Sequence, residues 1–274
     1  MIQDIYPHTL QNEFIPSLTA QGDDLVLNYA LKSALVKVED GRVTFPKVSQ
    51  ISAPNLTYAF SIDQERFFLS LDTLKLEEFA LQPLANLRSV KPDPYRFAIM
   101  SGYHLYTWYT RNKFCGRCSH PMLHHPKLRA MECPECKNIS FPRIDPAVIV
   151  GVVDRDRILV TKYAGRDYKG LALIAGFCEF AETVEETVKR EVKEEVGLKV
   201  SQVKYFASQP WGKDSNLLLG FFAQAESNQL TDFDHQELSS AQWITREDLP
   251  QDKEHASLTA HMIEHFRLYG SPFT

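Results

Sequence analysis

The sequence predicts a mixed fold of the α+β class, in which an α/β/α sandwich follows a β-rich N-terminal domain and a small metal module. Three observations lead to this prediction. Short apolar runs bounded by turn residues recur along the 274 residues. Stretches with apolar residues at helical spacing interrupt these runs, and two tight cysteine pairs divide the chain near its middle. Strands and helices mixed in this way usually pack as a sheet covered by helices.

The bulk composition is that of a protein with a buried core. Hydrophobic residues make up 44% of the chain and charged residues 24%. No apolar run approaches the roughly 18 residues needed to cross a bilayer, and the first residues lack the basic and apolar regions of a signal peptide. We therefore expect a cytoplasmic protein without a membrane partner. The net charge of −5 argues against a surface devoted to long nucleic acid.

Residues 1–110 are expected to form the β-rich domain with a connector helix. Asp40-Gly41 lies between two apolar runs and is a strong signal for a two-residue hairpin. From Pro94 to about Asn112, apolar residues recur at spacings of three and four, which predicts a helix. The strands expected before this helix are residues 35–38, 42–45, 56–62 and 66–71.

Residues 111–142 are expected to form a zinc ribbon. Cys115 and Cys118 form one CxxC pair, Cys133 and Cys136 form a second, and fourteen residues separate the pairs. Four thiolates complete a tetrahedral Zn²⁺ site and leave no open position, so this zinc would be structural. Three histidines lie between the pairs and are alternative ligands: His120, His124 and His125. Redox-active thiols are the other interpretation of the two pairs.

Residues 143–274 are expected to form the sandwich. Here the chain alternates apolar runs with two helical stretches, one rich in glutamate at 184–196 and one amphipathic at 257–269. The strands expected in this part are residues 148–153, 158–162, 171–175, 203–207, 217–225 and 241–244.

The glutamate-rich helix has defined ends and an acidic face. Thr183 with Glu186 is a capping box, and Gly197 suits the position after the last turn. Three further glutamates stand at positions i, i+3 and i+4 and therefore share one face. These residues are Glu191, Glu194 and Glu195.

The same helix places carboxylates against its buried side. A valine every fourth residue from Val184 to Val196 makes an apolar stripe, and Glu195 projects inside that arc. A carboxylate turned toward a core is costly, and crowded carboxylates repel one another. Divalent cations relieve both penalties, and oxygen ligands suit Mg²⁺ or Mn²⁺. A solvated acidic face, with Arg190 and Lys193 as partners, is the alternative interpretation.

The whole stretch from Gly176 to Leu198 resembles the Nudix box, G-x5-E-x7-R-E-U-x-E-E-x-G-U, where U is aliphatic. It matches at every fixed position, nine of them over 23 residues: Gly176, Glu182, Arg190, Glu191, Val192, Glu194, Glu195, Gly197 and Leu198. The resemblance implies a mixed sheet between helices. It also implies hydrolysis of a nucleoside diphosphate linked to another group.

The order of the three parts is similar to that of the NADH pyrophosphatase (NAD⁺ diphosphatase) branch of Nudix hydrolases. Ser208-Gln209-Pro210-Trp211 matches the opening of that branch's signature, S-Q-P-W-P-F-P-x-S. The chain then departs from the signature, because Gly212-Lys213-Asp214-Ser215-Asn216 replaces its second half. The branch implies cleavage of NAD(H) to nicotinamide mononucleotide (NMN) and AMP, removal of NAD caps from RNA by some members, and a homodimer.

This resemblance assigns roles to single residues. It implies that Glu191, Glu194 and Glu195 bind Mg²⁺ or Mn²⁺ and carry out catalysis, with Glu237 as a further ligand or general base. Gly176, Glu182 and Arg190 would support the cluster. Phe141, Phe177 and Gln209 would bind a base or the nicotinamide ring.

Two other functions remain open on the sequence. One is a Nudix pyrophosphatase for ADP-ribose or another nucleoside diphosphate derivative, which the altered segment 212–216 favours. The other is a nucleic-acid-binding module with an inactive Nudix domain. Its basis is the basic character of the ribbon, to which four residues contribute: Lys113, Arg117, Lys127 and Arg129.

Overall fold

The computed structural model describes the chain except residues 53–54, 166–169, 231–236, 252–255 and 274. The described residues form two compact units. The N-terminal unit comprises Ile2–Ile144 together with Trp211–Ser215. The C-terminal unit comprises Met1, Asp145–Pro210 and Asn216–Thr274. Among the described residues, none of the helices has the length and apolar character that crossing a membrane requires.

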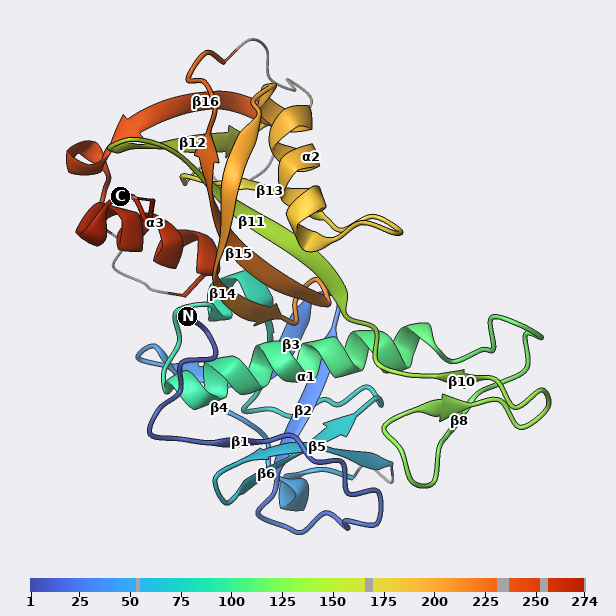
Figure 1. Cartoon of the computed structure of the whole chain (residues 1–274). Coiled ribbons are helices and arrows are strands. Elements are labelled where there is room, and N and C mark those ends of the chain that lie inside the picture. The colour runs from blue at the N-terminus through green and yellow to red at the C-terminus, as the bar shows by residue number, and fades with distance from the viewer. Residues whose placement is uncertain (53–54, 166–169, 231–236, 252–255, 274) are drawn as a thin grey trace. The chain divides into compact units, whose positions relative to one another are not determined.

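A seven-stranded sheet makes up most of the N-terminal unit, with strand order β1-β5-β6-β2-β3-β4 and β7 paired to β3 (Figure 1). Strands β2 and β6 run parallel, and the other pairs with a defined register are antiparallel. The strands are β1 (Leu10–Gln11), β2 (Leu25–Ala30), β3 (Ser33–Glu39), β4 (Arg42–Thr44), β5 (Leu56–Ile62), β6 (Glu65–Ser70) and β7 (Ala80–Pro83). Two short 3₁₀ helices, η1 (Val48–Gln50) and η2 (Leu84–Leu87), lie in the connections.

The hairpin expected at Asp40-Gly41 is confirmed. Glu39 pairs with Arg42 across a two-residue turn. Asp40 and Gly41 both have positive φ, 49° and 74°, as a type I′ turn requires. This turn fixes the register of β3 and β4.

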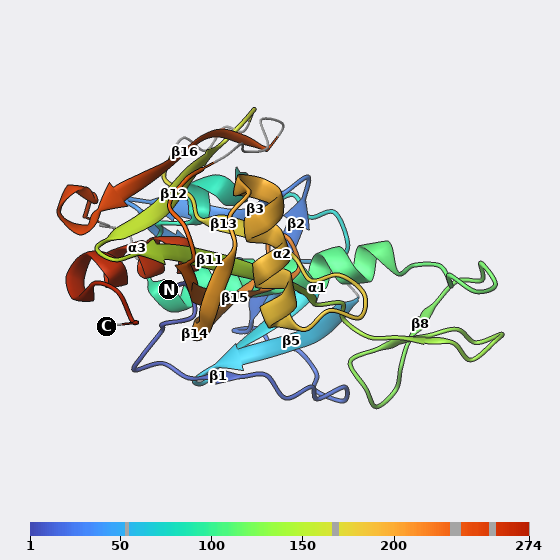
Figure 2. The same cartoon turned by 45° about the horizontal axis from the view of Figure 1, so that its top comes forward.

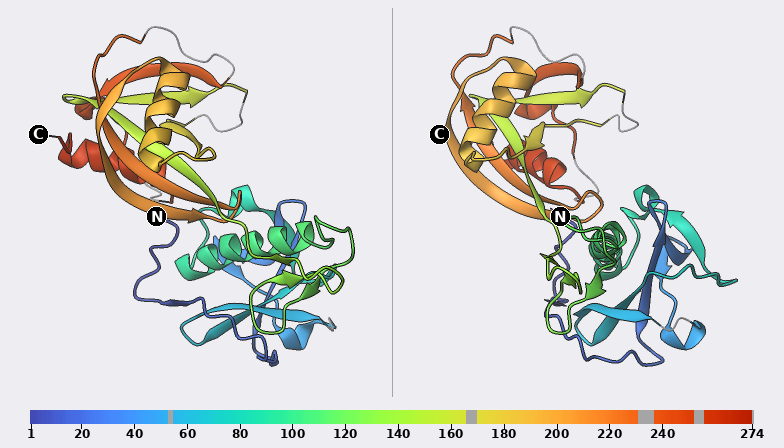
Figure 3. Two further views of the ribbon diagram at one scale, coloured as in Figure 1. Left: turned by 45° about the vertical axis from the view of Figure 1, so that its right-hand side comes forward. Right: turned by 90° about the vertical axis from the view of Figure 1, so that its right-hand side faces the viewer.

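Helix α1 (Asp93–Arg111) packs closely against the sheet, and Figure 3 shows it end-on in its right-hand view. Gly102 permits the close approach, since a Cβ there would lie 2.4 Å from the Tyr29 hydroxyl. That hydroxyl donates a hydrogen bond of 2.7 Å to the carbonyl of Ile99, one turn earlier. The helix predicted at 94–112 is therefore confirmed, and it closes the core of this unit.

The cysteine module is a three-stranded antiparallel sheet in the order β10-β9-β8. Its strands are β8 (Leu123–His124), β9 (Met131–Glu132) and β10 (Ile139–Ser140). Met131 belongs to the core that α1 closes, and the His124 ring stacks on Tyr109 of α1 at 4.9 Å. The module therefore packs against α1 by one of its faces.

The C-terminal unit is built on a six-stranded mixed sheet with strand order β14-β15-β11-β12-β16 and β13 paired to β11. Strands β11 and β15 are parallel, while β12 and β13 run antiparallel to β11. The strands are β11 (Asp145–Asp154), β12 (Arg157–Tyr163), β13 (Ile174–Phe177), β14 (Val200–Trp211), β15 (Asn216–Ala225) and β16 (Leu238–Thr245). The 3₁₀ helix η3 (Arg246–Asp248) follows β16.

Two separate cores lie on the two faces of this sheet. Val148, Val150 and Val152 of β11 pack with the valines of α2 (Val184–Val196). Ile149, from the opposite face of β11, belongs to the core formed with α3 (Leu258–Tyr269). Figures 1 and 2 show the two helices on opposite sides of the strands. The predicted α/β/α sandwich is confirmed.

Most of the predicted strands differ by one to three residues at an end, and two of them differ most. The strand predicted at 171–175 begins only at Ile174, and Ala172 makes an isolated bridge to Thr161. The strand predicted at 203–207 runs on to Trp211. The sequence did not predict this extension, because Ser208 and Gln209 are polar and interrupt the apolar run. The sequence alone does not show which groups bond a buried amide such as that of Gln209.

Candidate active site and cysteine cluster

Helix α2 holds its acidic face in a fixed rotation. Thr183 accepts a hydrogen bond from the Glu186 amide, and the Glu186 carboxylate accepts one from the Thr183 amide, so the expected capping box is present. The helix ends at Gly197, whose φ is 70°. Between these ends, Val188, Val192 and Val196 are fully buried. The rotation of α2 about its axis is therefore set by the core.

Strand β13 runs beside this acidic face and leaves little room. Glu195 is only 4% exposed, and its Oε1 accepts a hydrogen bond of 3.3 Å from the Ala175 amide. A Cβ at Gly176 would lie 2.0 Å from the carboxyl carbon of Glu191. Only glycine therefore lets the Glu191 carboxylate occupy its position against β13.

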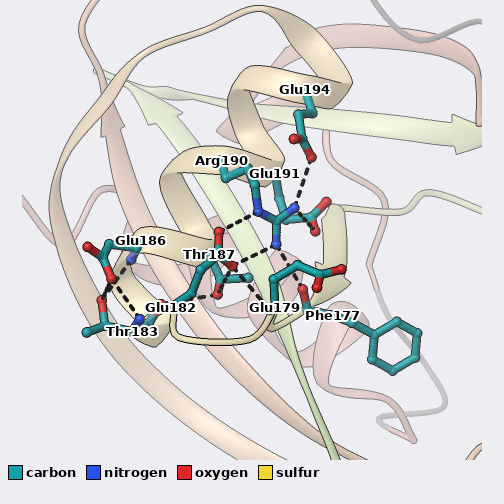
Figure 4. A network of polar contacts seen from close by, with 9 residues as sticks. All are labelled: Phe177, Glu179, Glu182, Thr183, Glu186, Thr187, Arg190, Glu191 and Glu194. Carbon is teal, nitrogen blue, oxygen red and sulfur yellow. Dashed lines mark hydrogen bonds and ion pairs between the residues drawn. The ribbon is translucent and has the colours of Figure 1, made fainter.

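Arg190 connects three glutamates and the loop before the helix (Figure 4). Its Nε and Nη2 bond the two carboxylate oxygens of Glu182 at 2.7 and 2.9 Å. Its Nη1 bonds Glu191 at 2.7 Å and Glu194 at 2.9 Å. Nη2 also donates to the Phe177 carbonyl at 3.0 Å. A planar guanidinium can satisfy all of these acceptors at once, which a lysine could not.

The charges at the site are unequal. Hydrogen bonds from Arg190 lower the pKa of Glu182 to about 2, so this carboxylate stays ionised. Burial raises the pKa of Glu191, and the negative charges of Glu194 and Glu237 raise it further, although Arg190 opposes them. Glu191 is therefore a carboxylate whose negative charge is only partly compensated. A cation would supply the missing compensation.

A divalent cation fits this group by its chemistry, since carboxylate oxygens are the ligands of Mg²⁺ and Mn²⁺. Within the described part of the chain, however, only cysteines bring three or more ligand atoms within 4.8 Å of one another. Glu191 and Glu194 are instead bonded to Arg190. The site thus offers oxygen donors of the right kind, and Arg190 holds two of these carboxylates in position.

Glu237 directly precedes β16 and is exposed, and its carbonyl accepts a hydrogen bond of 2.8 Å from the Ala164 amide. Its charge contributes to the pKa of Glu191, so the two carboxylates act on each other electrostatically. The preceding residues of that segment, Asp234, His235 and Gln236, lie outside the described residues.

The four paired cysteines converge, with their sulfur atoms within 4.8 Å of one another. Three sulfur–sulfur distances are 3.6 Å for Cys115–Cys136, 3.4 Å for Cys118–Cys133 and 3.3 Å for Cys118–Cys136. A tetrahedron with zinc–sulfur bonds of about 2.3 Å has edges of about 3.8 Å. The cluster can therefore hold a metal ion.

Each CxxC pair forms the same tight turn. The amide of Ser119 donates to the Cys115 carbonyl at 2.8 Å, and the amide of Lys137 donates to the Cys133 carbonyl at 3.1 Å. Both of these following residues have positive φ, 62° and 58°. A backbone hydrogen bond from Arg117 lowers the pKa of the Cys115 thiol to about 6. The first turn thus favours a thiolate at Cys115, the form that binds metal, whereas hydrogen bonds among the crowded sulfur atoms raise the pKa of Cys118.

The three histidines of the module make other contacts. His124 stacks on Tyr109, and His125 Nδ1 accepts hydrogen bonds from the amides of Lys127 and Leu128. The remaining one, His120, lies 3.2 Å from the Cys118 carbonyl through Nδ1. The ligand cluster is therefore the four cysteines, and the histidines are outside it.

A known domain family matches the part of the chain that contains the α2 carboxylates. The NUDIX domain model matches residues 143–266. The chain contains a NUDIX domain. It is 37% identical over 175 residues to the NAD-capped RNA hydrolase NudC of Vibrio vulnificus, covering 63% of this chain and 66% of that protein. It is 36% identical over 165 residues to the protein of the same name from Salmonella typhi, covering 60% and 63%. The matched segments thus span just under two thirds of these relatives.

Among solved structures, the chain is similar to a NUDIX hydrolase from Nitrosomonas europaea, with a TM-score of 0.48 and 21% identity over 57% of this chain and 90% of that one. A MutT NUDIX hydrolase from Burkholderia pseudomallei gives a TM-score of 0.37 at 21% identity, over 44% of this chain and 97% of that one.

Of the three residues expected to bind a ring, one is placed differently from the other two. Phe177, in the Nudix domain, is 54% exposed, and Figure 4 shows its ring directed away from Arg190. Phe141, in the N-terminal unit, is 57% exposed. Gln209 is fully buried, and its amide bonds the Ala256 carbonyl at 3.0 Å and the Leu258 amide at 2.6 Å. Both ends of the Gln209 amide thus hold the start of α3, so its position does not support ring binding.

Thr187 is a member of the Nudix site that sequence reasoning missed. Its side chain is fully buried and its hydroxyl donates 2.9 Å to the Glu182 carboxylate. The sequence does indicate its position, because Thr187 follows the capping Thr183 by four residues and therefore lies on the same side of α2. Threonine is common at such positions for packing alone, so the sequence does not single it out.

Proposed function

We propose that this protein is a divalent-metal-dependent pyrophosphohydrolase that cleaves the diphosphate of NAD(H) into NMN(H) and AMP. The single observation that carries the proposal is the carboxylate group of α2, in which Glu195 is buried and the partly buried Glu191 is paired with Arg190. The names of the relatives, NAD-capped RNA hydrolases, support the dinucleotide as substrate.

We assign metal binding to Glu191, Glu194 and Glu195, with Glu237 as a further ligand or the general base. A bound Mg²⁺ or Mn²⁺ would neutralise charge on the diphosphate and lower the pKa of the attacking water. In the reaction, a bond forms between the water oxygen and one phosphorus, and the bridging P–O bond breaks. The leaving phosphate keeps the bridging oxygen with its electron pair, and a carboxylate takes the proton from the water.

The supporting residues act before and during this step. Arg190 keeps Glu182 ionised and holds Glu191 and Glu194 in reach of a shared ligand. Gly176 leaves the space that Glu191 needs. Exposed Phe177 and Phe141 are proposed to stack on a base or on nicotinamide, because their rings are accessible and aromatic rings stack on flat heterocycles.

The proposal also covers the second metal, the cell compartment and the oligomeric state. We propose Zn²⁺ for the four cysteines, in a structural role, because four thiolates leave no open coordination position. The thiols require a reducing compartment, so we propose a cytoplasmic protein. A homodimer and activity on NAD-capped RNA are further expectations from the names and branch of the relatives.

The test is product release from purified protein with Mg²⁺ or Mn²⁺, comparing NADH, NAD⁺ and ADP-ribose. Release of NMN(H) and AMP that disappears in Glu195→Gln is expected. Turnover of ADP-ribose alone would retain the Nudix chemistry and reject the dinucleotide. That outcome would support the second candidate function, a pyrophosphatase for ADP-ribose. The observation that favours this function is Gly212, which stands at the position where the branch signature has a proline. Inactivity on all three compounds would reject an enzyme of this class.

A further inference from the structure

The cysteine module has a charge opposite to that of the rest of the chain. Between Arg111 and Ile144 there are seven lysines and arginines and two glutamates, whereas the whole chain has 30 basic and 35 acidic residues. The module therefore carries +5 within a protein of net charge −5. A tetrathiolate zinc site contributes −2, which leaves the module positive. Such a local excess attracts anions despite the acidic total.

Not every basic residue of the module is available. The Arg129 guanidinium lies over the Phe14 ring at 5.2 Å and donates to the Asn12 carbonyl at 3.1 Å. Its side chain therefore holds the N-terminal segment in place. The other six basic residues of this stretch are exposed: Arg111, Lys113, Arg117, Lys127, Lys137 and Arg143.

The three-stranded sheet has one covered face and one open face. Leu123, Glu132 and Ile139 are aligned across β8, β9 and β10 and therefore share a face, while the alternate residues include buried Met131. Leu123 and Ile139 are exposed. Phe114, which is 66% exposed, pairs with Pro121, two residues before Leu123.

Phe114, Leu123 and Ile139 define what we call the open face of the ribbon. In the module, an exposed lysine directly precedes an exposed apolar residue twice, at Lys113-Phe114 and, in the loop between β8 and β9, at Lys127-Leu128. Flexible cations and an exposed aromatic ring offer phosphate contacts together with a surface on which a base can stack. That combination is how single-stranded nucleic acid is bound without sequence preference.

We infer that the open face of the ribbon binds the chain of a single-stranded RNA. The choice of RNA over DNA rests on the proposed function, since the relatives are named hydrolases of capped RNA. Lys113, Arg117 and Lys127 contact phosphates, and Phe114 stacks on a base. The contact is with the RNA chain itself and involves neither the Nudix carboxylates nor the cap.

The test measures binding of an uncapped, unstructured 20-nucleotide RNA, labelled at its 3′ end, to the full-length protein by fluorescence anisotropy. No divalent cation is added, so hydrolysis does not interfere. The first variant combines Lys113→Gln, Arg117→Gln and Lys127→Gln. Its matched control removes the same charges from exposed positions elsewhere, with Lys75→Gln, Arg155→Gln and Lys199→Gln. Zinc content and far-UV circular dichroism check that each variant is folded.

The ribbon variant is expected to raise Kd at least about tenfold at 0.1 M salt, and to reduce the slope of log K against log salt by about 2, roughly 0.7 for each phosphate that is no longer neutralised. Phe114→Ala is expected to raise Kd at least about fivefold, while Tyr6→Ala, at another exposed aromatic residue, leaves it unchanged. Glu132→Gln removes a negative charge from the open face and is expected to tighten binding.

Equal losses in the ribbon variant and its control would overturn the inference, because binding would then follow net charge alone. Unchanged RNA binding together with an altered oligomeric state would overturn it in favour of a second copy of the chain. Equally tight binding of DNA of the same sequence would overturn the assignment to RNA. If the ribbon variant loses zinc, Lys127→Gln alone, outside both CxxC turns, repeats the comparison.

The proposed hydrolase activity is measured separately. Ribbon variants are expected to retain wild-type turnover of NADH. Loss of RNA binding with unchanged NADH turnover supports the inference, whereas a wild-type protein that binds RNA and hydrolyses no dinucleotide rejects only the proposed function.

Discussion

Arg190 and Glu182 form a bidentate pair across the loop that precedes α2, with Nε–Oε1 at 2.7 Å and Nη2–Oε2 at 2.9 Å. The pair lies eight residues apart in sequence and fixes both ends of the loop, because Nη2 also bonds the Phe177 carbonyl. The third group of the guanidinium, Nη1, is left for Glu191 and Glu194. The geometry of the α2 carboxylates therefore depends on a planar side chain at position 190.

Replacing Arg190 by lysine tests this dependence. A lysine keeps the positive charge but cannot bond Glu182, Glu191 and Glu194 in one plane, so we expect kcat to fall about 10- to 100-fold, the range found when partners of metal ligands are removed. The control is Arg267→Lys, which breaks an equivalent bidentate pair with Glu264, at 2.8 and 2.7 Å, away from the site. Similar losses of activity in both variants would show that stability, and not carboxylate geometry, is the cause.

The turn that replaces the second half of the branch signature gives a second prediction. A Cβ at Gly212 would lie 2.0 Å from the carbonyl oxygen of Met100, in the same unit. Gly212→Ala is therefore expected to destabilise the protein by about 1–3 kcal/mol, the range for overpacked sites. Gly116→Ala is the control, since nothing lies within 4 Å of its Cβ position. Denaturant unfolding measures both, and equal midpoints would contradict the close contact.

Substitution of one cluster cysteine tests the metal assignment. Cys133 is fully buried among the four sulfur atoms, so Cys133→Ser is expected to lower the zinc content from about one ion per chain to near zero. The module has few other means of folding, so faster proteolysis within residues 111–142 should accompany the loss. Cys178→Ser, at the cysteine outside the cluster, is expected to keep its zinc. Retention of zinc by the Cys133 variant would place the ion elsewhere.

The sequence predicted the Nudix helix well because two independent patterns coincided there. The valine repeat determined which side of α2 is buried, and the capping residues determined its ends, so the burial of Glu195 followed from geometry alone. The role of Gly176 could not be predicted in this way. Its need for space depends on β13 lying against α2, a contact between residues 15 positions apart.

Gln209 shows the opposite case. The motif suggested a residue available to a ligand, but its amide is buried and holds the start of α3. Local sequence cannot distinguish a polar side chain that serves a ligand from one that serves a distant backbone segment, because both are polar residues in a strand. The partners of Gln209 lie 47 and 49 residues further along the chain.

The final prediction concerns the stability of the C-terminal unit at low pH. His265 of α3 packs against Phe206 at 4.8 Å, Phe222 at 6.1 Å and Tyr269 at 4.9 Å. Burial lowers its pKa below 6.5, so the folded protein binds a proton at His265 less readily than the unfolded chain does. The contribution of the neutral His265 to the free energy of unfolding is therefore fully present above pH 6.5. It is lost as the pH falls from 6.5 through the lower pKa of the folded state.

His265→Phe keeps an aromatic ring in the cluster but removes the titrating group. We expect the decrease in Tm between pH 7.5 and pH 5.5 to be smaller in this variant than in the wild-type protein, by about 1–2 °C. His120→Gln, at an exposed histidine, is expected to leave the decrease unchanged. Differential scanning calorimetry at the two pH values measures both. An identical decrease in wild type and His265→Phe would mean that the proton taken up on unfolding binds at another residue.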